Sequence, residues 1–285
     1  MTLQTDMLYT RKTFFYEYPL EEADVVLVGV PFDSTEIGFP VRFGPLFLRE
    51  AIKNLPGWDP ELRINIFEKL KFCDLGDIEV VPGSWRATQN IIKDTIRDIF
   101  SKNPRIFPVF LGGEHLITLG ILQSLSEILK ERITVIQFDA HRDLMSEWMG
   151  EKYSHITWAY HIAKSPEFEL VQIGCRSWDK SEENVLKKFA VKEKLEKTEN
   201  PVYITVDLDV FDPKHAPEVG TPEPMGITPK EFFSCLKKIC KNRIIGLDIV
   251  ECASQRVNTQ TALLGAYIFK KVLGYNICSK NSKWK

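Results

Sequence analysis

Three side chains that commonly bind metal ions stand close together in the middle of the chain. Asp139, His141 and Asp143 are spaced two residues apart, and they directly follow an apolar run from Ile133 to Phe138. Such a run is typical of a buried strand. A buried strand has little reason to end in two carboxylates and an imidazole, because burying an unpaired charge is costly. A bound cation would remove that cost. Alternatively, the three side chains could lie in a solvated loop, where no cation is needed.

Other acidic and imidazole side chains stand in the same position relative to predicted strands. His115, Asp207 and Glu251 each lie at, or just beyond, the end of an apolar run, and Asp209 follows two residues after Asp207. In an open parallel sheet, ligands bind beyond the carboxyl ends of the strands. We therefore expect these groups to meet Asp139 at one edge of a sheet.

These segments supply enough ligands for more than one metal ion. The candidates are two imidazoles and four carboxylates: His115, Asp139, His141, Asp143, Asp207 and Asp209. Four ionised aspartates cannot crowd together without cations, and the set fits two ions about 3.5–4 Å apart that share bridging carboxylates. Mixed carboxylate and imidazole ligands favour Mn²⁺, with Zn²⁺, Co²⁺ or Fe²⁺ as alternatives. Such a pair makes hydroxide available at neutral pH, which is the chemistry of hydrolysis. The competing interpretation is a set of unrelated surface aspartates with two structural histidines.

Two further side chains are candidates for contacts with a substrate. Glu251 is an extra carboxylate beyond the metal set, and it is suited to hold a cationic group. His155 lies near the start of a helix predicted over 153–164, where it could shuttle a proton or have a purely structural role. We interpret His161 and His215 as structural histidines.

Apolar runs that alternate with helical periodicity predict the scaffold. Strands are predicted near 24–30, 71–77, 106–111, 133–138, 170–174, 201–206 and 243–250. Helices are predicted to begin at Pro45 and to cover 88–100, 116–130, 153–164, 179–199, 228–240 and 259–275. This alternation implies an α/β fold with a mostly parallel sheet that is covered on both faces. No linker-like break is present, so we expect one domain over residues 1–285.

The bulk properties exclude several classes of protein. The net charge of −2 gives no electrostatic argument for binding nucleic acid or an anionic membrane. No apolar run approaches the roughly 18 residues of a membrane span, and residues 1–18 have no apolar signal core. The six cysteines lack short C-x-x-C spacing, so we expect reduced thiols in a cytoplasmic protein.

Five ordered segments resemble those of one enzyme family. They are Gly112-Gly113-Glu114-His115, Asp139-Ala140-His141-Arg142-Asp143, Thr205-Val206-Asp207-Leu208-Asp209-Val210-Phe211-Asp212-Pro213, Gly220-Thr221-Pro222-Glu223-Pro224 and Asp248-Ile249-Val250-Glu251. On these segments, and over nearly its whole length, the sequence resembles the ureohydrolases, that is arginases, agmatinases and their relatives, and it is most similar to the agmatinases. The resemblance implies a three-layer α/β/α fold around a parallel sheet, and an oligomer, commonly a trimer or hexamer.

The resemblance also implies a role for each site residue. The family's six manganese ligands match residue types in this sequence, and the family binds two Mn²⁺ ions per subunit. By this resemblance, Asp139 and Asp207 bridge the two ions. The other four ligands complete one position (His115 and Asp143) and the second position (His141 and Asp209). The family's catalytic histidine corresponds to His155, and its guanidinium-binding glutamate corresponds to Glu251. Asp143 is expected to help on the metal side.

The implied reaction is hydrolysis of a small cationic guanidino substrate. Arginases carry a longer segment before the catalytic histidine, which holds the α-amino and α-carboxylate groups of arginine. The interval from Leu144 to Ser154 is short here and lacks that pattern, which favours agmatine, cleaved to putrescine and urea in polyamine biosynthesis. Alternative substrates are aminopropylagmatine, guanidinobutyrate, arginine, guanidine and formimino compounds. A less favoured alternative is a non-catalytic metal-binding relative.

Two groups of residues bear on the choice of substrate. Glu218 and Met225 stand where glycine is common in the family, in a loop expected to border the pocket. A substrate with a carboxylate would need a cationic partner, and the cations nearby in the sequence are Arg142, Lys152 and Arg176.

Overall fold

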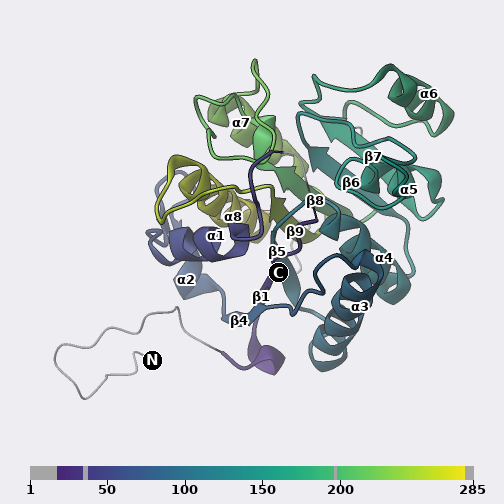
Figure 1. Cartoon of the computed structure of the whole chain (residues 1–285). Coiled ribbons are helices and arrows are strands. Elements are labelled where there is room, and N and C mark those ends of the chain that lie inside the picture. Colours follow the sequence, from purple (N-terminus) through teal and green to yellow (C-terminus); the bar gives the residue numbers. More distant parts are fainter. Residues whose placement is uncertain (1–17, 35–37, 196–197, 280–285) are drawn as a thin grey trace.

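A seven-stranded parallel sheet forms the centre of the molecule. The computed structural model describes residues 18–34, 38–195 and 198–279. Within them, the strand order is β4-β1-β5-β9-β8-β6-β7, and every neighbouring pair is parallel. Figure 1 follows this order across the molecule. In chain order the strands are β1 (Val25–Val30), β4 (Phe72–Asp77), β5 (Phe107–Gly112), β6 (Ile133–Phe138), β7 (Phe168–Ile173), β8 (Val202–Asp207) and β9 (Ile244–Val250). All seven predicted strands are present, with small shifts at their ends.

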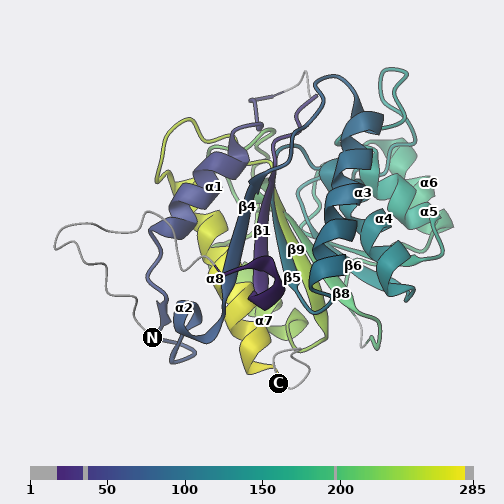
Figure 2. The same cartoon turned by 90° about the horizontal axis from the view of Figure 1, so that it is seen from below.

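Helices cover both faces of the sheet, which confirms the three-layer α/β/α arrangement. Figure 2 shows the sheet edge-on between the two helical layers. One layer contains α1 (Gly44–Lys53), α7 (Pro229–Ile239) and α8 (Gln260–Cys278). The other contains α3 (Trp85–Lys102), α4 (Ile117–Leu129) and α5 (Trp158–Lys164), with α6 (Lys180–Lys188) at its margin. The remaining short helices are α2 (Ile66–Lys69) and the 3₁₀ turns η1 (Leu20–Glu22) and η2 (Leu208–Val210).

Alternate residues of each strand contribute to two separate cores. In β1, Val25 and Leu27 pack under the α1/α7/α8 layer, whereas Val26 and Val28 pack under the α3/α4/α5 layer. Both faces are buried, which explains why the strand sequence is continuously apolar instead of alternating. The same alternation places side chains two residues apart on one face, and this determines which polar residues of β6, β8 and β9 can meet.

Local signals explain where several helices begin. Thr228 caps α7 in a capping box with Glu231, as its sequence predicts. Asp179 and Glu182 form a second capping box at the start of α6. Thr259 accepts a hydrogen bond from the backbone of Ala262 and caps α8.

Two helix predictions were wrong in extent. Helix α5 begins at Trp158, and residues 153–157 form turns, because the Thr157 hydroxyl bonds the backbone of Lys152 and Ser154. Helix α6 ends at Lys188, and the chain then turns through Ala190 at φ +51°. The sequence also places Glu193 and Lys197 at the i,i+4 spacing of a helical ion pair, but Lys197 is not among the described residues.

A small hairpin was not predicted. Strands β2 (Trp58–Asp59) and β3 (Ile64–Asn65) pair antiparallel and lie against α8. Lys270 donates to the backbone oxygens of Pro56 and Trp58, and Lys271 forms an ion pair of 2.8 Å with Asp59. Two strands of two residues each are too short to give a recognisable periodicity.

Two further findings concern the whole described chain. No helix among the described residues is long and apolar enough to cross a membrane. All six cysteines are free thiols.

Candidate functional site

The register of three neighbouring strands brings the predicted site residues to one edge of the sheet. Phe138 of β6 pairs with Val206 of β8, and Val206 pairs with Ile249 of β9. Asp139 and Asp207 follow these positions by one residue, and Glu251 follows by two. The convergence expected at the carboxyl ends of the strands is therefore present.

The first cluster surrounds one nitrogen of His115. His115 Nδ1 lies 3.0 Å from Asp139 Oδ2, 3.4 Å from Asp207 Oδ2 and 3.5 Å from Asp143 Oδ2. All four residues are buried. Although three carboxylate oxygens surround it, His115 Nδ1 has no hydrogen-bond partner. A buried nitrogen of this kind is suited to a metal ion, and His115, Asp139 and Asp143 meet the geometry of a metal-binding group.

The second cluster shares Asp139 with the first. His141 Nδ1 lies 2.9 Å from Asp209 Oδ2 and 3.6 Å from Asp139 Oδ1. Asp209 Oδ2 is buried without a hydrogen-bond partner. Asp139, His141 and Asp209 form the second group with metal-binding geometry. Asp139 therefore directs one oxygen toward each histidine, which is the arrangement of a bridging carboxylate.

Local hydrogen bonds hold the carboxylates in place. Asp139 Oδ1 accepts from the backbone N–H of His141 at 2.6 Å, and Asp207 Oδ1 accepts from that of Asp209 at 2.8 Å. These two-residue contacts are Asx turns, in which the side chain bonds its own following backbone. Asp143 stands at φ +55°, and its Oδ2 accepts from the Trp158 indole at 2.7 Å.

The electrostatics of the clusters fit divalent ions. Burial raises the pKa of Asp207 well above its usual range, and the neighbouring carboxylates raise it further. Burial lowers the pKa of His115, but hydrogen bonding and attraction to Asp139 and other carboxylates outweigh burial and raise it to about 9. Without metal, imidazolium groups thus supply the positive charge that the aspartates need. Two divalent ions would supply more charge and would use the unpaired nitrogen and oxygen as ligands, so the residues present fit such a pair.

Glu251 lies directly beside the first cluster. It stands at φ +61°, and its Oε1 accepts from the backbone N–H of His115 at 2.8 Å. Its Oε2 lies against Gly220, where an added Cβ would approach it to 2.4 Å, so a larger residue at this position would displace the carboxylate. Burial raises the pKa of Glu251 to about 8. A cationic partner would return this carboxyl group to its ionised form.

His155 lies in the turn before α5 and not in a helix. Its Nδ1 is 3.2 Å from the Ser154 hydroxyl. Burial lowers the pKa of His155 to about 4, and the positive charges of His141 and His115 add to this effect. Its imidazole is therefore neutral near pH 7 and can accept a proton. By contrast, His161 stacks on Tyr153 and contacts the Lys152 carbonyl at 2.8 Å, which agrees with a structural role.

Two arginines near the clusters are committed to the protein itself. The Arg142 guanidinium donates to Gln172 and Glu193 and stacks on Trp178. Among the described residues, Arg176 donates to six backbone oxygens, those of Gly174, Asp209, Val210, Phe211, Glu223 and Pro224. Arg176 thereby joins the loop that carries Asp209 to the loop that carries Glu223.

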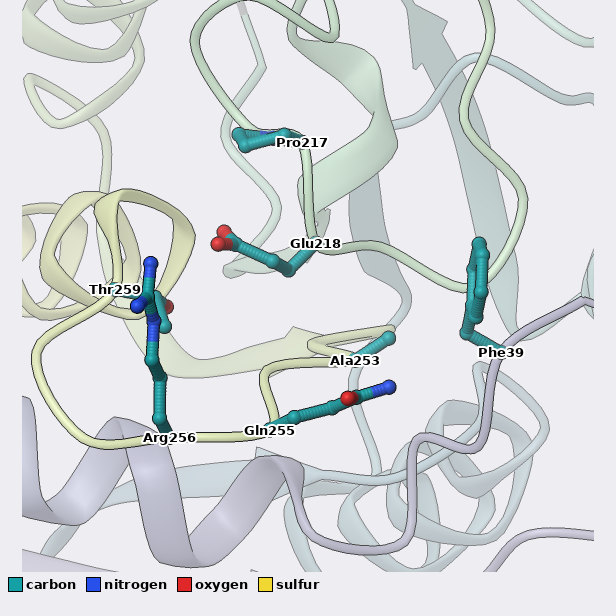
Figure 3. A pocket seen from close by; sticks show the side chains of 7 residues that line it. All are labelled: Phe39, Pro217, Glu218, Ala253, Gln255, Arg256 and Thr259. Carbon is teal, nitrogen blue, oxygen red and sulfur yellow. The ribbon is translucent and has the colours of Figure 1, made fainter.

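A cavity of about 450 Å³ lies beside the segment that follows Glu251 (Figure 3). It is lined by Phe39, Pro217, Glu218, Ala253, Gln255, Arg256 and Thr259. Glu218 lines this cavity, and its carboxylate accepts from the Thr261 hydroxyl at 2.6 Å at the start of α8. Met225, the other residue expected to border the pocket, is exposed at φ +65° and does not line this cavity.

Sequence reasoning missed four polar residues that lie beneath the clusters. Gln172 of β7, Gln137 of β6, Thr205 of β8 and Asp248 of β9 are paired in register across four neighbouring strands, and all are buried. We call this set the polar row. A signal for it exists in the sequence, because Gln137 and Thr205 interrupt apolar runs two residues before Asp139 and Asp207.

Comparison with known proteins agrees with this geometry. A sequence model described as the arginase family matches residues 23–193 and 189–274. The chain is 33% identical to an N(1)-aminopropylagmatine ureohydrolase of Thermococcus kodakarensis, with 95% of this chain and 97% of that protein covered. It is 32% identical to an agmatinase of Pyrococcus horikoshii, with 94% and 98% covered.

A solved structure also superposes on it. The agmatine ureohydrolase of Thermoplasma volcanium matches with a TM-score of 0.77 and 26% identity, covering 94% of this chain and 92% of that one. The family match extends over most of the chain, and both relatives cover nearly all of it. The chain therefore belongs to the arginase family, as a ureohydrolase of the agmatinase type.

Proposed function

We propose that this protein hydrolyses agmatine to putrescine and urea with two Mn²⁺ ions per subunit. The observation that carries the proposal is the meeting of two histidines, four aspartates and Glu251 at one sheet edge, with His115 Nδ1 and Asp209 Oδ2 left without hydrogen-bond partners. We further propose one ureohydrolase domain over residues 1–285. The proposed setting is polyamine biosynthesis in the cytoplasm, as a homo-oligomer, a trimer or hexamer.

The six ligands would divide between two positions. Asp139 and Asp207 would contact both ions, as the two directions of the Asp139 oxygens support. His115 and Asp143 would complete one position, and His141 and Asp209 the other. When bound, a pair of divalent ions acidifies water and stabilises negative charge that develops in the reaction. Carboxylate and imidazole ligands without thiolate favour Mn²⁺ for this pair.

Glu251 would hold the guanidinium group of the substrate. One of its oxygens already accepts from His115, so its direction relative to the metal ligands is fixed. A guanidinium can donate two hydrogen bonds to a carboxylate, which gives both strength and orientation. The bound cation would also stabilise the ionised form of Glu251, whose pKa burial raises to about 8.

His155 would carry the proton that the leaving group needs. Water adds to the guanidinium carbon, the bond from that carbon to the alkyl-bearing nitrogen breaks, and this nitrogen must leave as a protonated amine. A neutral imidazole can take a proton from the attacking water and pass it to the leaving nitrogen. The low pKa of His155 keeps it neutral and ready for this step near pH 7. Asp143, whose Oδ2 is fixed by Trp158, would support the attack from the metal side.

The state of the arginines favours a substrate without a carboxylate. Arginine, guanidinobutyrate and formimino amino acids all carry one, and its burial without a cation would be costly. Arg142 and Arg176 are both engaged by protein groups, which leaves Arg256, at the cavity that follows Glu251, as an arginine that such a carboxylate could meet. Agmatine instead carries an amine at its far end. Aminopropylagmatine shares this property, and it is the second candidate because a relative that covers 95% of the chain bears its name.

The proposal is tested by urea release from protein loaded with Mn²⁺. The substrates are agmatine, aminopropylagmatine, guanidinobutyrate, arginine and guanidine, and putrescine is quantified alongside urea for agmatine. We expect equal amounts of urea and putrescine, and kcat/KM highest for agmatine. Preference for aminopropylagmatine would select the second candidate, and preference for a carboxylate-bearing compound would contradict the argument from the arginines. No urea from any compound, with two ions bound, would favour a non-catalytic metal-binding protein.

A further inference from the structure

The polar row crosses four neighbouring strands, and two of them, β6 and β8, lead directly into candidate metal ligands. Gln172, Gln137, Thr205 and Asp248 follow one another across β7, β6, β8 and β9. At the same level, the next strands contribute Phe110 of β5 and Val28 of β1, which are apolar. Burying amides, a hydroxyl and a carboxylate inside a sheet is costly unless each is hydrogen-bonded. The position of the row therefore calls for a reason other than packing.

Thr205 connects the row to His115. His115 Nε2 lies 2.8 Å from the Thr205 hydroxyl, and this hydroxyl donates to Asp248 Oδ1 at 2.5 Å. Because its single hydrogen is used on Asp248, the hydroxyl oxygen must accept from Nε2–H. The proton of a neutral His115 is therefore held on Nε2, and the lone pair of Nδ1 is directed at the aspartates.

Asp248 is held at the end of this connection by three hydroxyl groups. Besides Thr205, it accepts from Thr118 at 3.0 Å and from Tyr203 at 2.9 Å, both to Oδ2. All of these residues are fully buried. Three donors satisfy the carboxylate, so it can remain in the core as an acceptor for Thr205.

Gln137 connects the row to Asp139. Its Nε2 donates to Asp139 Oδ2 at 2.8 Å, and its Oε1 accepts from Gln172 Nε2 at 2.9 Å. Arg142 determines this orientation, because a guanidinium only donates and it lies 3.1 Å from Gln172 Oε1. Each amide is therefore fixed by the one before it, and the last N–H faces the carboxylate shared by the two clusters.

We propose that the polar row is a supporting layer for the metal centre, in which Thr205 positions His115 and Gln137 positions Asp139. The proposal rests on the proposed function in one respect, since it requires ions at these residues. Thr205 and Gln137 are positioning residues, which act through the side chains they contact. Partners of this kind, bonded to metal ligands, typically change metal affinity by about 10- to 100-fold when they are removed.

The test is Mn²⁺ binding by titration calorimetry and Mn²⁺ spin resonance, without substrate. Thr205→Val removes the hydroxyl at nearly constant volume. We expect this variant to bind one of the two ions about 10- to 100-fold more weakly. Thr205→Ser keeps the hydroxyl, so its two Mn²⁺ affinities should stay close to those of the wild-type protein. Gln137→Leu should weaken the binding of both ions, because Asp139 is proposed to contact both metal positions. If Thr205→Val does not fold, the result for Gln137→Leu decides.

Thr134→Val is the matched control. Thr134 is buried in β6 and its hydroxyl donates to Glu169 at 2.9 Å, so the variant loses the same type of bond. Thr134 precedes Asp139 by five residues, which is about 16 Å along a strand. It should lose stability but keep both Mn²⁺ affinities and the spin-resonance spectrum.

The proposal would be overturned if Thr205→Val and Gln137→Leu bound Mn²⁺ as tightly as the wild-type protein. It would also be overturned if Thr134→Val lost as much Mn²⁺ affinity as these two variants. Wild-type protein that binds two ions but releases no urea would contradict the proposed reaction and leave the supporting layer intact. Wild-type protein that binds no Mn²⁺ would overturn both.

Discussion

Five of the six candidate metal ligands are buried, His141 is partly exposed, and hydrogen bonds orient four of the buried ones. Asx turns hold Asp139 and Asp207, the Trp158 indole holds Asp143, and Thr205 holds His115. Such fixed ligands lose little conformational freedom when an ion binds. At this scale the site is preorganised by hydrogen bonds that do not involve the metal.

The first prediction concerns Glu251, the carboxylate that we place outside the six candidate metal ligands. Glu251→Gln should lower kcat/KM for agmatine on the order of 100-fold, because a buried charge pair with the guanidinium is lost. Mn²⁺ stoichiometry should stay at two, measured by metal analysis after gel filtration. Glu169→Gln, a change in a carboxylate paired with Lys192 near the amino end of β7, is the control and should keep full activity. Loss of an ion in Glu251→Gln would instead identify Glu251 as a ligand.

The candidate ligands could be predicted from the sequence, whereas the contacts made by their supporting residues could not. A ligand such as Asp139 or Asp207 follows an apolar run directly, so its position at a strand end is visible in one sequence. The contact of Thr205 with Asp248 depends on β8 lying beside β9, and that of Gln137 with Gln172 depends on β6 lying beside β7. Sheet order is not chain order, so a single sequence does not reveal these pairs. The metal roles of the ligands remain predictions.

At the scale of elements, the sequence predicted the type of each long element better than its ends. Thr228 and Thr259 gave correct starts for α7 and α8 because their caps are local. The charged run after Asp179 gave a helix that was too long, since i,i+4 charge pairs indicate a helix but contain no stop signal. The stop comes from the turn at Ala190 and from pairing of Lys192 with Val171, which is a tertiary contact.

The attachment of the β2/β3 hairpin to α8 predicts a dependence of stability on pH. Hydrogen bonds from Lys237 and Lys271 lower the pKa of Glu61 to about 2, from 4.5. Because the folded-state pKa is depressed, this stabilisation is complete above about pH 4.5 and is lost as the pH falls through about 2.

Glu61→Gln should therefore reduce the free energy of unfolding at pH 6, with a difference from wild type that disappears near pH 2. Urea denaturation of both proteins across this range is the measurement. Glu183→Gln, a change on the exposed side of α6, should show little difference at any pH. A difference for Glu61→Gln that persists unchanged at pH 2 would contradict the account.

At the scale of the molecule, the site lies at the edge of a sheet whose two cores do not depend on metal. The core residues of both faces pack through aliphatic and aromatic contacts. Metal should therefore add to the stability of a fold that already exists. This differs from small zinc domains, which fold only when the metal binds.

Removal of metal by chelation should abolish urea release and lower the unfolding temperature without unfolding the protein at 25 °C. Mn²⁺ at about 100 times its Kd would stabilise by about 2.7 kcal/mol for each ion bound, or about 4 to 5 °C per ion for a chain of 285 residues. Thermal unfolding followed by circular dichroism, with and without Mn²⁺, measures the shift. Asp139→Ala should show a much smaller shift, and an unchanged shift in that variant would contradict its place in both positions.

The central claim is that two ions are held between Asp139 and Asp207. Anomalous diffraction at the manganese edge, from crystals grown with Mn²⁺, tests this claim most directly. The account predicts two peaks about 3.5–4 Å apart, one beside His115 Nδ1 and the other beside His141 Nδ1, with Asp139 in contact with both. A single peak, or two peaks that share neither aspartate, would contradict it.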